Sequence, residues 1–235
     1  MGNITPDFLV LGFIRYVVFL FSTTCHEASH ALAAKLGGDL TAFHSGQVSL
    51  NPVPHMRREP FGMVLMPLLG LFLGGAVIGW ASAPYDPLWR ARNPKKAAWM
   101  SLAGPAANFA LVLVAALLIH AGLFAGAFHP PERLNSLHLV EGTSDVTAGI
   151  AKVLSVVFSL NLLLGVFNLL PVPPLDGFGA VGILLPDRGI RAWDRFGDSI
   201  RQFSFLGLIL GWRLIEYLYW PIFGAGVRLL YPGAG

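Results

Sequence analysis

Residues 26–30 are His26-Glu27-Ala28-Ser29-His30, and they lie within an apolar segment of about residues 8–36. A segment of that length can cross a bilayer as a helix. Two histidines four positions apart share one face of a helix, so both imidazoles can bind a single Zn²⁺. Glu27, beside them, can accept a proton from water. The stretch therefore predicts a zinc-dependent proteolytic site inside a membrane.

Polar residues at this depth need an explanation, because a glutamate and two histidines in a membrane segment are costly unless they pair, bind metal or face water. One alternative is that they hydrogen-bond to neighbouring helices without any metal. The single cysteine, Cys25, excludes a disulfide framework and a cysteine-rich zinc module. Lying beside His26, Cys25 is either a further ligand or a small buried helix residue.

The composition is that of a membrane protein. The 235 residues are 54% hydrophobic and only 12% charged, and the mean hydropathy is +0.63. A soluble domain of this size would not bury so much apolar surface. The net charge of +3 is too small to indicate a nucleic-acid partner.

Apolar stretches recur along the whole chain, without internal repeats or a separate soluble domain. The sequence therefore predicts an all-α polytopic membrane protein with about five to six apolar helical segments. We expect a single domain over residues 1–235, with a core of about 8–185 and a C-terminal helical extension of about 186–235. The segments are about 8–36, 61–81, 97–125, 146–170, 203–219 and 222–231, the last two divided by Pro221.

Residues 40–50 suggest a short β-structure after the first helix. Two short stretches, 40–43 and 47–50, flank a turn at Ser45-Gly46. We expect a membrane-associated β-hairpin whose edge could bind an extended substrate segment as an added strand.

A break follows the fourth apolar segment, where Pro171, Pro173 and Pro174 precede Leu175-Asp176-Gly177. Prolines end a helix and leave carbonyls without partners, and broken backbone at membrane depth usually lines a cavity. Asp176 is therefore a candidate third metal ligand. The alternative is a carboxylate that caps the short segment after Gly177.

The C-terminal part contains charged helices. Residues 186–202 have apolar side chains at helical spacing among arginines, which is typical of an amphipathic helix on an anionic membrane surface. An ordinary helix packed under the domain is the alternative. Further on, Arg213 and Glu216 are close enough on a helix to form an ion pair.

Three separated motifs resemble the site-2 proteases, peptidase family M50. The first is His26-Glu27-Ala28-Ser29-His30, and the second is Gly104-Pro105-Ala106-Ala107-Asn108. The third is Asn168-Leu169-Leu170-Pro171 followed by Pro174-Leu175-Asp176-Gly177. The stretches 49–55 and 79–81 resemble the small branch of the family that has neither a PDZ nor a CBS domain.

This resemblance implies that His26, His30 and Asp176 bind one zinc ion per chain and that Glu27 is the general base. Asn168 matches a family asparagine thought to assist near the metal. Asn108, in the second motif, would either orient a ligand or pack helices. The family cleaves transmembrane segments of membrane proteins, so such proteins and the lipid bilayer are the expected partners.

The membrane topology follows from the requirement that these ligands meet. His26 and His30 come late in the first long segment and Asp176 follows the fourth, so those two segments should run in the same direction. Residues 61–81 should then enter and return, with Pro67 and Gly70 as candidate bends. The basic loops then share one side, which the positive-inside rule makes cytoplasmic. We expect a bacterial or archaeal cell membrane, with the metal nearer its cytoplasmic face.

Two other functions remain open at the level of sequence. A catalytically silent member of the family would bind membrane proteins without cutting them. A metal or ion transporter would use the histidines and carboxylates as a pathway.

Overall fold

The computed structural model describes residues 5–74 and 77–232 of this mostly helical chain. Three of its helices are long and apolar enough to cross a membrane. The expected number of about five to six apolar helical segments is not confirmed. The three helices are α1 (Pro6–Gly37), α6 (Pro94–Phe124) and α7 (Asp145–Asn168).

Local sequence signals set the ends of the long helices. The side chain of Thr5 accepts a hydrogen bond from the Phe8 amide at 3.2 Å, and Pro6 occupies the first turn of α1. The helix ends at Gly38, whose φ of 100° is accessible to glycine at little cost. Ser144 and Thr147 form a reciprocal capping box at the start of α7.

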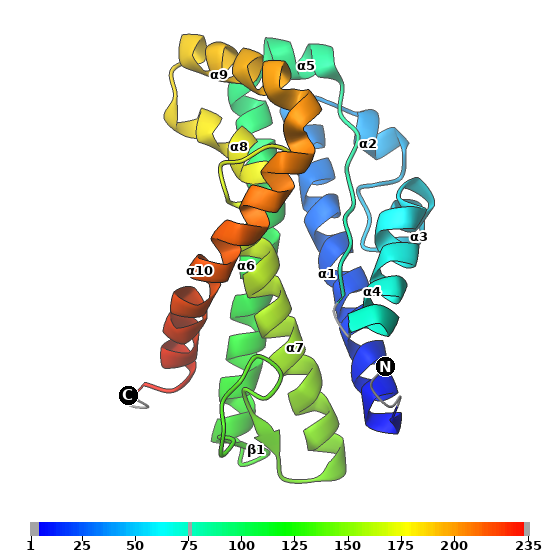
Figure 1. The fold of residues 1–235 in the computed structure, drawn as a ribbon, viewed down its shortest axis with the longest axis vertical. Helices are drawn as coiled ribbons and strands as arrows, with labels where there is room; N and C mark the ends of the chain where they lie inside the picture. Colours follow the sequence, from blue (N-terminus) through cyan, green and yellow to red (C-terminus); the bar gives the residue numbers. More distant parts are fainter. Residues whose placement is uncertain (1–4, 75–76, 233–235) are drawn as a thin grey trace.

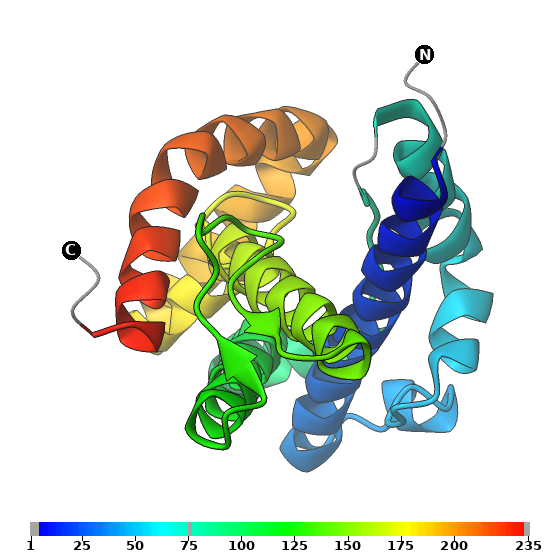
Figure 2. The same ribbon diagram turned by 90° about the horizontal axis from the view of Figure 1, so that it is seen from below.

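Helices α1 and α7 run in one direction and α6 runs in the other (Figure 1). This confirms the expectation that the first and fourth apolar segments are parallel. Helices α6 and α7 stand between α1 on one side and α10 (Ser204–Leu230) on the other (Figures 1 and 2).

The second apolar segment enters and returns, as expected. It forms a π-helical turn, η1 (Phe61–Leu65), and a short helix, α4 (Met66–Gly74), after which the chain runs back beside α1 towards α5 (Pro87–Arg92) (Figure 1). The returning stretch contacts the start of the segment, where the Trp80 amide donates to the Gly62 carbonyl at 3.2 Å. The helix continues past Pro67 and Gly70, so neither residue is the bend.

The hairpin expected at residues 40–50 is wrong. This region forms the short helix α2 (Thr41–His44), a turn and then α3 (Pro52–Arg58). The helix is favoured because the Asp39 carboxylate accepts hydrogen bonds from both the amide and the hydroxyl of Thr41. The strands that the structure describes lie elsewhere, where β1 (Phe128–His129) pairs antiparallel with β2 (Glu141–Gly142).

The segment after α7 folds back on the helix bundle. It comprises α8 (Asp176–Ala180), the 3₁₀ turn η2 (Val181–Leu184), α9 (Asp187–Ile200) and the 3₁₀ turn η3 (Arg201–Phe203). Helix α9 is amphipathic, and its Trp193 stacks on Phe178 of α8 with ring centroids 4.5 Å apart. This contact favours the packed-helix alternative over a helix whose apolar face lies free on the membrane.

Pro221 does not divide the last apolar region, contrary to expectation. Helix α10 continues through it from Ser204 to Leu230, because a proline removes a single backbone hydrogen bond and the buried side chains of Ile215 and Phe223 hold the helix on both sides of it. Arg213 and Glu216 on this helix form the predicted pair, with 3.5 Å between Nη1 and Oε2.

Candidate metal centre

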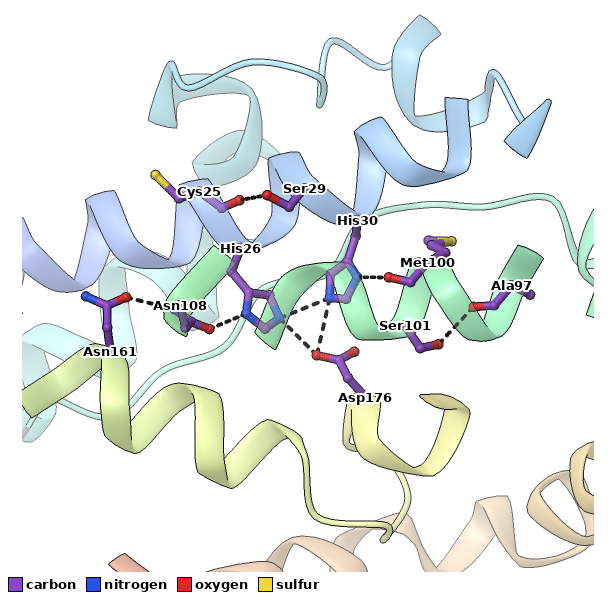
Figure 3. Close-up of polar contacts among 10 residues, drawn as sticks. All are labelled: Cys25, His26, Ser29, His30, Ala97, Met100, Ser101, Asn108, Asn161 and Asp176. Carbon is purple, nitrogen blue, oxygen red and sulfur yellow. Dashed lines mark hydrogen bonds and ion pairs between the residues drawn. The ribbon is translucent and has the colours of Figure 1, made fainter. Parts of the chain in front are cut away.

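Three candidate metal ligands converge at one point between α1, α6 and α8 (Figure 3). His26 and His30 point from one face of α1, and each is only 6% exposed. Asp176 is the first residue of α8. Its Oδ2 lies 2.9 Å from Nε2 of His26 and 3.2 Å from Nε2 of His30, and the two Nε2 atoms are 3.0 Å apart.

These distances fit a shared metal ion. Ligand atoms bound to a tetrahedral zinc at its usual bond lengths lie about 3.3 Å from one another. Two imidazole nitrogens and one carboxylate oxygen are a donor set that zinc accepts, and three protein ligands leave a fourth position open. Among the described residues, these three form the group of histidine, cysteine and acidic side chains close enough to hold an ion.

The protonation of His30 agrees with this fit. Its Nδ1 lies 2.7 Å from the Met100 carbonyl oxygen, which can only accept a hydrogen bond. In the neutral ring the proton is therefore on Nδ1, and Nε2 presents a lone pair towards the other two candidate ligands. A metal-binding histidine normally donates its second nitrogen in this manner.

Helix α6 leaves space at the centre because position 104 is a glycine. A Cβ placed on Gly104 would lie 2.6 Å from Cε1 of His30 and would collide with Nε2 of both histidines. The backbone of α6 thus approaches the candidate ligands as closely as a helix can. The second sequence motif, Gly104 to Asn108, lies at this contact.

Glu27 lies between the two histidines in sequence and is 5% exposed. Its Oε2 is buried and has no hydrogen-bond partner among the described residues. A buried carboxylate oxygen without a partner is costly unless it serves a function. Its place beside the donor cluster fits a group that exchanges protons with a reacting water.

Asp176 is held in place by its surroundings. Its side chain supplies the one anionic oxygen donor of the three, since aspartate binds metal as the carboxylate and histidine as the neutral imidazole. Beyond α8, the Lys95 ammonium donates to the carbonyls of Ile183 at 2.9 Å and Leu185 at 2.5 Å, which ties this segment to the start of α6.

Other residues considered at the level of sequence lie outside the cluster. Asn168 is half-buried at the end of α7, and its side chain makes no hydrogen bond to a described residue. Nε2 of His55 contacts the Ser49 carbonyl oxygen at 3.0 Å. The Cys25 side chain points away from the candidate ligands (Figure 3).

Two asparagines stand out in the structure. Asn108, from the second motif, places Oδ1 2.6 Å from Nδ1 of His26. Asn161 on α7, which the sequence analysis did not single out, accepts a hydrogen bond from Asn108 at 2.8 Å. An asparagine in the middle of an apolar helix is its only sequence signal, since polar residues in such helices are rare.

Together, the apolar helices and the buried histidine–carboxylate cluster between them define a helical metalloprotein of the membrane-embedded class. Comparison with known proteins makes this more specific. The model of Peptidase family M50 matches residues 14–210, so the chain belongs to peptidase family M50.

Several curated proteins are similar over most of the chain. "Putative zinc metalloprotease YwhC" of Bacillus subtilis (strain 168) is 31% identical over 219 residues, covering 92% of this chain and 89% of YwhC. "Putative zinc metalloprotease Rip2" of Mycolicibacterium smegmatis is 29% identical over 220 residues, covering 92% and 76%. "Putative zinc metalloprotease Rip3" of Mycobacterium tuberculosis (strain H37Rv) is 31% identical over 195 residues, covering 82% and 34%. No solved structure gave a significant match.

Proposed function

We propose that this chain is a zinc metalloprotease that cleaves peptide bonds in or near transmembrane segments of membrane proteins. The observation that carries the proposal is the convergence of His26, His30 and Asp176 beside the buried carboxylate of Glu27. Membership of peptidase family M50 supports the reaction class.

The residues of the centre have separate roles in this proposal. His26, His30 and Asp176 would hold one zinc ion per chain. The chemistry that zinc supplies when bound is Lewis acidity, which polarises a peptide carbonyl and makes water more acidic. Glu27 accepts the proton of the attacking water on its carboxylate and returns it to the leaving amine. Asn168 would assist near the metal.

A transmembrane substrate is favoured by where the cluster lies. His26 and His30 are in the second half of α1, one of the three helices that can span a membrane. An apolar segment reaches such a site without leaving the bilayer, whereas a polar peptide would have to be desolvated. A helical substrate must unwind before its peptide bonds become accessible.

The cluster would lie nearer the cytoplasmic face of a bacterial or archaeal cell membrane. In support, α5 and α9, which carry Arg90, Arg92, Arg188, Arg191 and Arg195, lie at the same end of the bundle as α8 (Figure 1). Basic residues favour the cytoplasmic side. Labelling of single cysteines introduced at Arg92 and Arg133 in intact cells, in a Cys25→Ser background, tests this orientation: we expect labelling at residue 133 alone.

The decisive experiment combines metal content with cleavage, using purified wild type, Glu27→Gln and Asp176→Asn and a panel of single-span membrane substrates. The exposed Glu132 supplies a matched control, Glu132→Gln. We expect about one zinc per chain and cleavage in wild type and in the control. Glu27→Gln should keep zinc and lose cleavage, whereas Asp176→Asn should lose both.

Three other results would contradict the proposal or favour a different function. Cleavage by Glu27→Gln at the wild-type rate would refute its role as general base. Zinc binding without cleavage of any substrate would favour a catalytically silent member of the family. Metal flux across vesicles that depends on Asp176 would favour a transporter.

A further inference from the structure

Four buried polar side chains, Ser22, Asn161, Asn108 and His26, are joined by hydrogen bonds into one continuous network. Figure 3 shows its course from Asn161 on α7 through Asn108 to His26 at the candidate metal centre. Asn161 donates from Nδ2 to the Val157 carbonyl and to Ser22 Oγ, both at 2.8 Å. Its Oδ1 accepts from Asn108 Nδ2 at 2.8 Å, and Asn108 Oδ1 lies 2.6 Å from Nδ1 of His26. Ser22, Asn108 and Asn161 are fully buried.

The direction of these hydrogen bonds is fixed from the far end. The Val157 carbonyl can only accept, so the Asn161 amide must turn its NH₂ group towards it. Oδ1 of Asn161 then faces Asn108, which must present its own NH₂ group. This leaves Oδ1 of Asn108 as an acceptor, and Nδ1 of His26 must be the donor.

This direction of hydrogen bonding determines which nitrogen of His26 is available to bind the metal. With its proton on Nδ1, the neutral ring of His26 has a lone pair on Nε2, the atom nearest Asp176. We propose that Asn161, acting through Asn108, is a positioning residue that fixes the tautomer and ring orientation of His26 for metal binding. This inference rests on the proposed function in one respect, that His26 is a metal ligand.

The two histidines are thus oriented by different means. His30 uses a backbone carbonyl of α6 directly, whereas His26 depends on side chains from two other helices. Simple helix packing would not need this polarity, because buried amides are costly in an apolar bundle unless all their groups are paired. The same series of hydrogen bonds links α7 to α1, because Asn161 donates to Ser22, which lies one helical turn before His26.

The test compares substitutions at Asn161 by their zinc affinity, measured by competition with a chromophoric chelator on folded protein. Asn161→Leu removes the polarity, so Asn108 is free to rotate. We expect zinc binding to weaken about 10- to 100-fold, the usual effect of losing an outer partner of a metal ligand. Asn161→Asp should bind within about threefold of wild type, because a buried aspartate stays protonated. Its single hydroxyl can donate to the Val157 carbonyl and its other oxygen can accept from Asn108, so only the bond donated to Ser22 is lost.

Ser155→Ala is the matched control. Ser155 is on the same helix, is fully buried and accepts a hydrogen bond from the Leu139 amide at 3.0 Å, outside the chain to His26. A purely structural role of Asn161 would make Asn161→Leu resemble this control, with lower stability and unchanged zinc affinity. That result would overturn the proposal.

A second measurement needs no variant. Nitrogen-15 NMR of histidine-labelled, metal-free wild type should show the His26 ring protonated on Nδ1. A ring protonated on Nε2 alone would refute the proposal even if every variant fails to fold. If wild type binds no zinc but His26 has the expected tautomer, the proposed function fails and the hydrogen-bonded chain stands.

Discussion

Substitution of Gly104 by alanine should strongly weaken metal binding while leaving the helix bundle folded. The added Cβ would lie 2.6 Å from Cε1 of His30 and would collide with both Nε2 atoms. Carbon atoms in good contact are about 3.5–4.0 Å apart, so the histidine rings or α6 must move by roughly 1 Å. Metal–ligand distances tolerate only about 0.2 Å, so at least one imidazole should leave the metal.

The size of the effect can be bounded. We expect zinc affinity to fall at least about 100-fold, since loss of a direct ligand exceeds the 10- to 100-fold cost of losing its outer partner. Overpacking costs about 1–3 kcal/mol, and alanine regains about 1 kcal/mol of helix propensity over glycine. The free energy of unfolding should therefore change by less than about 2 kcal/mol.

The assay is zinc competition and thermal unfolding in detergent, with Gly149→Ala as the matched control. Gly149 is also within a long helix, α7, but a Cβ there meets nothing within 4 Å. The control should keep its zinc and gain slightly in stability. If Gly104→Ala bound zinc within threefold of wild type, the centre could not lie where we place it.

Three further predictions concern the surroundings of the site. Lys95→Met should lower the midpoint of thermal unfolding and weaken zinc binding, because the carbonyls after α8 lose their donor; Lys96→Met, which loses one exposed hydrogen bond to the Gly37 carbonyl, should do neither. Burial raises the pKa of Asp39, but hydrogen bonds from Thr41 and Asp86 outweigh it and hold that pKa below its usual range. Stability from Asp39 should therefore be present above about pH 4 and be lost as pH falls further; unfolding midpoints from pH 3 to 6 should show a flatter profile for Asp39→Asn, and an identical profile would refute the assignment. Removal of the metal by a chelator should stop cleavage, and stoichiometric zinc should restore it; activity that persists in metal-free protein would contradict a metal-dependent reaction.

The long helices could be predicted from the sequence because their apolar length is itself the signal. Histidine spacing likewise placed His26 and His30 on one face of α1, and the proline-rich break indicated that Asp176 comes back to them. These inferences depend on the spacing of residues along a helix and on the cost of burying polar groups in lipid. Both can be judged from the sequence alone.

The errors have a common physical cause. Residues 40–50 form α2 and a turn, because the Asp39 carboxylate accepts hydrogen bonds from Thr41 at the start of α2 and the Gln47 side chain donates to the Pro54 carbonyl at 3.0 Å. Such contacts override weak local preference in short segments. Asn161 was missed because its importance depends on which helix lies opposite it, and no spacing rule records that.

Asp176 and His26 meet although 150 positions separate them in the chain. At a synthesis rate of about 5–20 residues per second, the candidate ligand on α8 emerges roughly 8–30 seconds after those on α1. During that interval the nascent chain has two imidazoles but no complete centre. Under the proposed function, a chain still being synthesised is thus inactive, and proteolytic competence arrives only after α8 has joined α1 and α6.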